Sequence, residues 1–385
     1  MPTLNGFAYP TIAEAMVNIT DNMHDQTIIL TADHAEDVVI PANRDVTIDL
    51  AGFTLTNAGE AHTITVEGAL RVKGPGTVLS TAAGRAAVFV TPTGEAVIDG
   101  NPSMTQSKGD YYVMENQGRL AILTGDFVST SPNASLLRNG YENETVNLVG
   151  NTAITEVSGG TFKGQTILLK NDTAGDLQVS GGTFVTDKEC VLNWNVCEIS
   201  GGNFQSNAQE CVWTAANTPA EGYVSETIGV TRIRGGTFKG VGADLKLIAD
   251  YAPANAPPEY AVSGGTFSAP VDDAFCVNGF KVVQMADGTF APEVVRDWDL
   301  PEGGILNLNL WGYKRLLIRR DSMDYASGGF DLPVEGFEPA VVIGVNVKGG
   351  ADAYWNSATR KIQLFRNNKE ISGKLEDLTL MVIGR

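Results

Sequence analysis

A short phrase, Ser-Gly-Gly-Thr-Phe, returns along the middle of the chain. It occurs at 158–162, 180–184 and 263–267, with variants at 124–127, 200–204, 234–238 and 286–290. The closing phenylalanines follow one another at steps of 20 to 35 residues, which is typical of repeats that bury a face only by stacking. Paired glycines permit a tight turn, and the flanking Val, Ile, Thr and Phe favour strands. The sequence therefore predicts one coil of a parallel β-helix per repeat.

The motif also predicts where its aromatic ring points. Because the same turn precedes each phenylalanine, every ring should enter its coil at the same phase. We expect an internal column of stacked rings, formed by Phe162, Phe184, Phe204, Phe238 and Phe267.

Charge and composition limit the classes of function. The 385-residue chain has a formal net charge of −18, which disfavours nucleic acid and anionic membranes as partners. Residues 303–385 carry a net +2 and the remainder −20, which suggests two units with different surroundings. No apolar run approaches the roughly 18 residues of a membrane span. The first residues lack the basic and apolar regions of a signal peptide.

The N-terminal part predicts a cap followed by entry coils. Thr11 and Glu14 form a capping-box pattern, and we expect an amphipathic helix over about 12–22 that covers the first coil. The stretch 27–57, with its Thr-Ala-Asp, Val-Ile-Pro and Ile-Asp-Leu-Ala-Gly-Phe-Thr-Leu phrases, resembles the entry coils of the right-handed parallel β-helix proteins of the pectin-lyase-like superfamily. The resemblance implies a fold and says almost nothing about activity, because enzymes, adhesins and phage spikes share it.

Beyond residue 290 the pattern changes. Residues 291–303 interrupt the repeat with proline, charge and tryptophan. Five apolar segments follow and are predicted as strands of a small antiparallel β-sandwich or jelly-roll, at 305–310, 315–318, 340–347, 361–365 and 378–383. The tail from 340 to 385 resembles the terminal domain of tailed-phage virion structural proteins, through an Asn-x-x-Thr-x-Lys turn before an aliphatic strand and a closing Ile-Gly-Arg.

The expected fold class is therefore all-β. A capping segment and helix (1–25) lead into a right-handed parallel β-helix (26–290). A linker (291–303) joins it to a C-terminal β-sandwich (304–385) that serves oligomerisation or particle attachment.

One pair of carboxylates stands out as a candidate site. Glu189-Cys190-Val191 and Glu210-Cys211-Val212 repeat the same word 21 residues apart, so the two should stack on adjacent coils about 4.8 Å apart. If the cysteines point inward as small apolar residues, Glu189 and Glu210 point outward. A disulfide between the two cysteines is a less favoured alternative.

Tryptophans accompany this pair. Trp194 and Trp213 lie on the same two coils and are candidate glycan platforms, so the constellation offers what a glycoside hydrolase needs. Solvated surface residues, or contacts to a neighbouring subunit, are the favoured explanation, and Lys188 is the sole cation between 171 and 231. We expect no catalytic residues, metal site or cofactor, since no Walker loop, dinucleotide fingerprint, zinc spacing or nucleophile elbow occurs.

The leading expectation for function is a non-enzymatic surface protein of a tailed-phage virion: a head decoration, head fibre or tail fibre. It would be assembled in the host cytoplasm as a homotrimer, contact other capsid or tail proteins and meet a host surface glycan. The first alternative is a tailspike-like polysaccharide depolymerase that uses Glu189 and Glu210. The second is a bacterial β-helix adhesin.

Overall fold

A computed structural model gives the arrangement of the chain. It describes residues 1–19, 27–141, 152–217, 227–250, 252, 256–294, 305–307, 314–325, 339–346, 352–356, 358–359, 361–366, 369–370 and 373–384. The chain divides into a β-helix unit, Met1–Phe275 with Val282–Pro292, and a C-terminal unit, Cys276–Lys281 with Glu293–Arg385. The described residues are almost all β, and none of their helices is long and apolar enough to cross a membrane.

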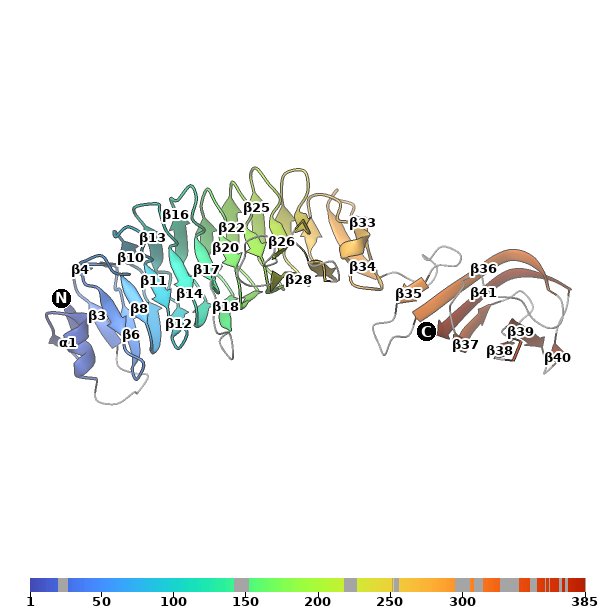
Figure 1. Cartoon of the computed structure of the whole chain (residues 1–385), viewed down its shortest axis with the longest axis horizontal. Coiled ribbons are helices and arrows are strands. Elements are labelled where there is room, and N and C mark those ends of the chain that lie inside the picture. The colour runs from blue at the N-terminus through green and yellow to red at the C-terminus, as the bar shows by residue number, and fades with distance from the viewer. Residues whose placement is uncertain are drawn as a thin grey trace. The chain divides into compact units, whose positions relative to one another are not determined.

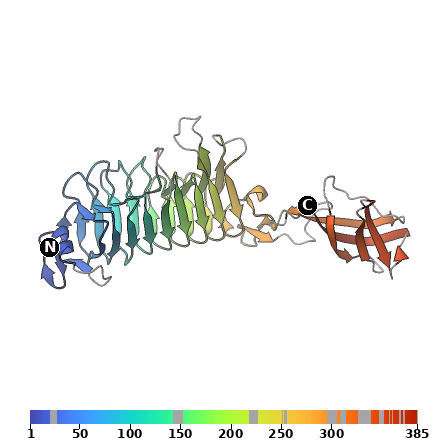
Figure 2. The same ribbon diagram turned by 60° about the horizontal axis from the view of Figure 1, so that its bottom comes forward.

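Three long sheets build the β-helix unit, and each coil gives one strand to each sheet (Figures 1 and 2). Sheet A runs β2 (Phe7–Ala8), β1 (Pro2–Leu4), β3 (Thr27–Leu30), β6 (Asp45–Asp49), β9 (Ala69–Lys73), β12 (Glu95–Ile98), β15 (Arg119–Ile122), β18 (Ala153–Val157), β21 (Gly175–Val179), β24 (Val196–Ile199), β28 (Val230–Ile233) and β31 (Glu259–Val262). All pairs from β3 onward are parallel.

Sheets B and C follow the same order along the coils. Sheet B contains β4 (His34–Ala35), β7 (Thr54–Thr56), β10 (Thr77–Ser80), β13 (Ser103–Gln106), β16 (Asp126–Ser129), β19 (Thr161–Lys163), β22 (Thr183–Thr186), β25 (Asn203–Ser206), β29 (Thr237–Lys239), β32 (Thr266–Phe267), β34 (Phe290–Val294) and β33 (Phe280–Gln284). Sheet C contains β5 (Val38–Ile40), β8 (Ile64–Val66), β11 (Val88–Val90), β14 (Met114–Asn116), β17 (Leu137–Asn139), β20 (Leu169–Asn171), β23 (Val191–Asn193), β26 (Val212–Asn217) and β27 (Thr227–Ile228), and β30 (Leu245–Ile248) also pairs with β26.

The repeated motif is the turn from sheet A into sheet B. In the coil of Ser180 the first glycine is required because the backbone of the previous coil lies too close for a side chain. A Cβ on Gly181 would lie 2.2 Å from the Ser158 carbonyl oxygen. The second needs a positive φ, which is +104° at Gly182. The turn delivers Phe184 into the interior, where its side chain is fully buried.

The phenylalanines of the motif form one stacked column inside sheet B. Neighbouring ring centroids lie 4.6–5.0 Å apart with interplanar angles of 3–16°, along Phe127, Phe162, Phe184, Phe204, Phe238 and Phe267. Phe127, from the weakest copy of the motif, joins the column. Phe290 lies opposite Phe267 in the pairing of β34 with β32, but β34 runs antiparallel to β32 and does not repeat the parallel coil. The motif copy at 286–290 is therefore not a further coil.

A second interior column, of asparagines, marks the end of four sheet C strands. The column consists of Asn116, Asn139, Asn171 and Asn193. Each of the first three donates from its side-chain N–H to the side-chain oxygen of the asparagine on the next coil, at 2.8 Å. The amides also bond backbone carbonyls of sheet A, as Asn171 does to Val196. All four are buried, so the ladder satisfies polar backbone where sheet C turns into sheet A.

Replacing Asn171 by leucine should lower the free energy of unfolding by roughly 1–3 kcal/mol, because the amides before and after it each lose a buried partner. Chemical denaturation of the full chain followed by tryptophan fluorescence measures the loss. An exposed loop asparagine, Asn133, gives the matched control, where the same substitution should change stability by about 0.5 kcal/mol or less. Equal effects at the two sites would show that the ladder does not stabilise the coil.

The first coil is capped as expected, by a shorter helix. Helix α1 (Ile12–Val17) ends before residue 22, where the predicted boundary lies outside the described residues. Thr11 accepts from the Glu14 backbone N–H as the N-cap. Glu36, which no motif had marked, accepts from the backbone N–H groups of Ile12 and Ala13 at 2.6 and 2.9 Å, so a carboxylate anchors the start of the helix to the β-helix.

Two parts of the last coil have partners within the chain. Strand β34 pairs with the last parallel strand of sheet B, and the ring of Phe275 packs on Tyr260 with centroids 4.9 Å apart. The predicted linker 291–303 lies mostly outside the described residues.

The C-terminal unit contains two antiparallel sheets in its described part. One runs β35 (Ile305–Asn307), β36 (Lys314–Tyr325), β41 (Gly373–Gly384), β37 (Pro339–Asn346), and the other β38 (Asp352–Asn356), β39 (Lys361–Arg366), β40 (Lys369–Glu370). The segment 378–383, predicted as a strand, lies within β41. Because β41 pairs with β36 on one side and β37 on the other, its backbone is not a free edge for another copy.

Candidate functional site

The outward face of sheet C gathers the charged and aromatic side chains of successive coils. The strand register places one residue per coil in a single outer column, and all but Leu192 are charged or aromatic: Glu115, Arg138, Lys170, Leu192, Trp213 and Lys246. Both candidate carboxylates flank this column, in the turns that lead into β23 and β26.

Glu189 and Glu210 occupy equivalent places on adjacent coils. The backbone N–H of Cys190 donates to the Cys211 carbonyl at 2.8 Å, which sets the two turns in register. Their environments differ, however. Glu189 is only 4% exposed, and this burial raises the pKa of its carboxyl, with a further contribution from the negative charge of Glu210. The structure thus stacks the predicted pair but places one member below the surface.

Glu210 is engaged with Trp213 and a lysine from the next coil. The Trp213 indole N–H donates to the Glu210 carboxylate at 3.1 Å. The Lys246 ammonium lies 4.0 Å from the centre of the Trp213 ring and 3.9 Å from the same carboxylate. The pair therefore has a nearby cation besides Lys188. Lys246 lies outside the segment 171–231, but β30 pairs with β26 and brings it alongside.

This cluster changes the interpretation of the tryptophans. A sugar platform needs an open ring face, and Lys246 covers one face of Trp213. Trp194 lies at the opposite end of its strand, directly after β23, where its backbone N–H donates to the Asn171 carbonyl. The structure therefore joins Glu210 with Trp213 and places Trp194 at another position of the coil.

The cysteines of the repeated word point inward. Cys190 and Cys211 are fully buried and free, and their thiols donate to the backbone carbonyls of Gln205 and Phe204 at 3.4 Å. Burial raises the pKa of the Cys190 thiol well above its usual value. Both residues serve as interior packing, and the disulfide alternative is not formed.

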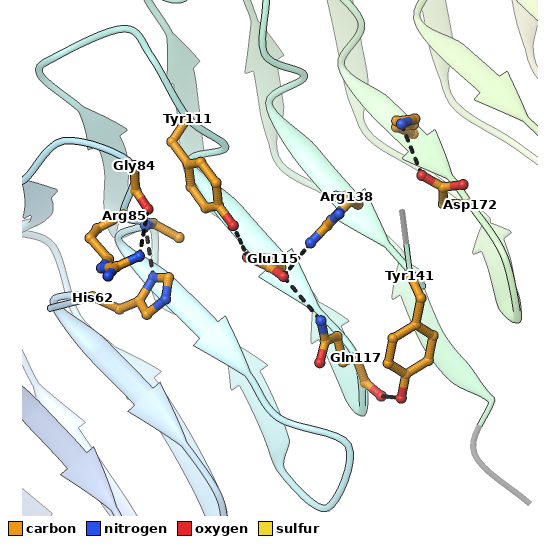
Figure 3. Close-up of polar contacts among 11 residues, drawn as sticks. His62, Gly84, Arg85, Tyr111, Glu115, Gln117, Arg138, Tyr141 and Asp172 are labelled. Carbon is orange, nitrogen blue, oxygen red and sulfur yellow. Dashed lines mark hydrogen bonds and ion pairs between the residues drawn. The ribbon is translucent and has the colours of Figure 1, made fainter. Parts of the chain in front are cut away.

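A second polar cluster lies toward the N-terminal end of sheet C, and no sequence argument had marked it (Figure 3). Arg138 donates to Glu115, which also accepts from the Tyr111 hydroxyl at 2.7 Å and the Gln117 amide at 3.1 Å. The guanidinium lies 4.8 Å from the Tyr112 ring centre. Glu115 and Arg138 are 3% and 5% exposed, although both occupy outward positions of the sheet.

The electrostatics of this cluster follow from the ion pair. Burial alone would lower the pKa of Arg138, but Glu115 together with Tyr112 and Tyr111 outweighs it and raises that pKa. Burial and Glu115 together raise the pKa of Tyr111. Arg138 therefore stays charged and Tyr111 stays a neutral donor, an arrangement that anchors the loop before β14 rather than one that exchanges protons.

One pattern in the sequence could have indicated both this polar cluster and the asparagine ladder. Four strands of sheet C end in the pattern aliphatic–variable–asparagine, in Met114–Asn116, Leu137–Asn139, Leu169–Asn171 and Val191–Asn193. The variable residues on neighbouring coils include the opposite charges of Glu115 and Arg138. Aligning the coils on asparagine as well as phenylalanine would have revealed both features.

His62 lies beside this cluster and makes a pH-dependent contribution to the stability of the fold. Its Nδ1 accepts from the Ala86 backbone N–H at 2.9 Å, and its ring lies 4.8 Å from that of Phe89. Burial lowers the pKa of His62 below 6.5, and Arg85 lowers it further, while Glu115 opposes them.

The unfolded chain therefore binds a proton at higher pH than the folded one. The free energy of unfolding should be constant above the pKa that His62 has in the unfolded chain. It should fall as the pH drops from there toward the pKa of His62 in the folded chain. We expect a His62→Gln variant to lose less stability than the parent between about pH 7 and about pH 5, as measured by urea denaturation at each pH. Parallel pH profiles for the two proteins would contradict this assignment.

Similarity to known proteins does not indicate a function for this site. No family model, curated protein or solved structure matches the chain. Within the described residues, no group of three or more His, Cys, Asp or Glu side chains could hold a metal ion. The residues on the outer face of sheet C are thus to be judged by their own contacts.

Proposed function

We propose that this chain is a non-enzymatic structural protein on the surface of a tailed-phage virion, as a head decoration, head fibre or tail fibre. The observation that carries the proposal is the unbroken column of six stacked rings from Phe127 to Phe267. Continuous interior packing of this kind resists local opening, as the rigid body of an exposed particle protein must.

The contacts of the candidate catalytic residues support the same conclusion. Glu210 is held by Trp213 and Lys246, and Glu189 is buried. A hydrolase needs two carboxyls that face one groove, about 5–9.5 Å apart. Glu189 is buried in its turn, and Glu210 is engaged with side chains of its own coil and of the next one.

The C-terminal unit supplies the proposed attachment. Its tail carries the resemblance to tailed-phage structural proteins, and its described sheets are antiparallel, unlike those of the β-helix unit. We infer that this unit forms the homotrimer or binds the neighbouring capsid or tail protein.

Immunogold labelling tests the proposed location. Antibodies against the β-helix unit should label phage particles purified from the strain that carries the gene, at one defined part of the particle. Particles that neither bind the antibody nor contain the chain by mass spectrometry would refute the proposal.

Sedimentation equilibrium tests the trimer separately. The purified full chain should have three times the 40.8 kDa mass of one chain. A stable monomer at all concentrations would remove trimerisation from the proposal without affecting the location.

A depolymerase is the second candidate, favoured by two observations. The pKa of Glu189 is raised, as a general acid requires, and Lys246 brings a cation to the same cluster. Incubation of the assembly with host capsular and cell-wall polysaccharide, compared with a Glu189→Gln, Glu210→Gln double variant, separates the two. We expect no turnover by either protein, and cleavage lost in the variant would establish the enzyme.

A further inference from the structure

Three asparagines of the chain are followed directly by glycine, and their surroundings differ. They are Asn5, Asn139 and Asn278. An asparagine before glycine is prone to spontaneous deamidation, because glycine has no side chain that hinders attack by its backbone nitrogen on the asparagine side chain. The reaction also needs space and a backbone that can move, so the fold decides which of these asparagines reacts.

Asn5 lies in the exposed turn between β1 and β2. Asn5 and Gly6 have φ angles of +52° and +81°, and the pairing of Leu4 with Phe7 makes this a type I′ hairpin turn. Both turn residues are exposed, and beyond its chain neighbours no atom lies within 4 Å of the place of a Cβ on Gly6. Within the described part of the chain, neither the Asn5 side chain nor the Gly6 N–H has a hydrogen-bond partner.

The strand that follows this turn is short and lies at an edge. β2 contains two residues, both exposed, and among the described strands it pairs only with β1. Short edge strands near a terminus open locally at little cost in free energy. Once the hairpin opens, the Asn5 backbone can leave its left-handed conformation and the Gly6 nitrogen can reach the Asn5 side-chain carbonyl.

Asn139 has the same neighbour and the opposite environment. It belongs to the asparagine ladder and is fully buried. Its side-chain nitrogen donates to the Asn171 side-chain oxygen at 2.8 Å and to the Asp176 carbonyl at 3.0 Å. The Gly140 N–H, whose nitrogen would attack, donates to the Asn116 carbonyl at 2.9 Å. The folded coil thus holds both reacting groups, and Asn139 can react only after the coil opens.

We propose that Asn5 is a site of spontaneous deamidation and that the ladder protects Asn139 from the same reaction. The Gly6 backbone nitrogen attacks the side-chain carbonyl carbon of Asn5, and the new C–N bond closes a succinimide ring. The side-chain nitrogen takes up the proton that Gly6 loses and leaves as ammonia. Water then opens the ring at either carbonyl and gives aspartate or isoaspartate, so water is the only co-reactant.

The modification changes the N-terminal end of the β-helix unit. Either product puts a negative charge on the turn, and isoaspartate also adds a methylene group to the backbone, which the type I′ turn does not accommodate. Because β1 pairs with β3, the first parallel strand of sheet A, we expect faster hydrogen exchange in β1 after modification.

Asn101 is a matched control within the same chain. It is exposed and has a φ of +61°, close to that of Asn5. The next residue is Pro102, whose nitrogen carries no hydrogen and cannot form the succinimide. Asn5 and Asn101 therefore share a backbone conformation and differ in the following residue, whereas Asn5 and Asn139 share the following residue and differ in burial.

The test is peptide mapping of the full chain by mass spectrometry after incubation at mildly alkaline pH, with isoaspartate measured by isoaspartyl methyltransferase labelling. In the folded protein Asn5 should deamidate at least about tenfold faster than Asn139, which reacts only from opened states. Asn101 should stay intact, and the exposed Asn278 should react as Asn5 does. In urea Asn5 and Asn139 should react at similar rates, because both are then exposed and precede glycine.

Deamidation at Asn5 that spares Asn101, and that reaches Asn139 only in urea, would establish the site and its protection. The inference is overturned if Asn5 stays intact in the folded chain or if Asn139 reacts as fast as Asn5 without urea. It is also overturned if Asn101 reacts as fast as Asn5, which would indicate direct hydrolysis, or if urea leaves Asn139 protected. These outcomes are independent of the proposed function, since immunogold labelling decides the location.

Discussion

Replacing Phe184 by alanine is expected to lower the free energy of unfolding by about 3–5 kcal/mol, the range for a large aromatic residue removed from a packed core. The side chain is fully buried, and its ring lies 4.7 Å from that of Phe162 and 4.6 Å from that of Phe204, centre to centre. The substitution thus removes two stacking contacts and leaves a cavity in mid-column. Denaturation by guanidinium chloride, with hydrogen exchange to locate the opening, measures the effect.

The same substitution at Phe7 is the matched control. Its side chain is 70% exposed, so Phe7→Ala should cost about 0.5 kcal/mol or less. Hydrogen exchange in the Phe184 variant should rise first in the coils of Phe162 and Phe204. A loss below about 1 kcal/mol at Phe184, within the range of ordinary substitutions, would mean that the column does not hold the coils together.

Replacing Arg138 by methionine should destabilise the protein by a similar amount, about 3–5 kcal/mol, because it leaves the buried Glu115 carboxylate without its counter-charge. The two side chains are almost inaccessible to water, so solvent cannot replace the guanidinium. The Tyr111 hydroxyl and the Gln117 amide would still donate to Glu115 but carry no charge. Chemical denaturation at neutral pH gives the loss.

A double variant distinguishes the unpaired charge from lost packing. Glu115→Gln combined with Arg138→Met removes both charges and should recover most of the stability lost by Arg138→Met alone. If the double variant is as unstable as the single one, packing of the guanidinium on Tyr112 accounts for the effect and the ion pair does not.

The repeated motif allowed the interior of sheet B to be predicted because it specifies backbone as well as side chain. At Gly181 and Gly182 only glycine fits the turn, so the pattern fixes the phase at which Phe184 enters the coil. The copy at 286–290 shows the limit of this argument. It has Asp287 where the coil of Ser180 has Gly181, and its strand reverses direction and pairs antiparallel with β32.

The candidate site was harder to predict because neighbours in a β-helix lie one coil apart, and coil lengths vary. Glu189 and Glu210 were placed on adjacent coils correctly, since their coils have almost equal length. Lys246 was missed because a longer insertion separates β26 from β30, so that the residue beside Trp213 lies 33 positions onward. The burial of Glu189 depends on packing around the turn, which no spacing reveals.

Cryo-electron microscopy of purified phage particles tests the central claim most directly. If the chain is a virion surface protein, the reconstruction should contain density for a three-sheeted β-helix with the Phe127–Phe267 column inside it. The C-terminal unit should contact another virion protein or two further copies of itself. A complete reconstruction in which every surface density is assigned to other chains, from particles whose host produces this protein in quantity, would contradict the account.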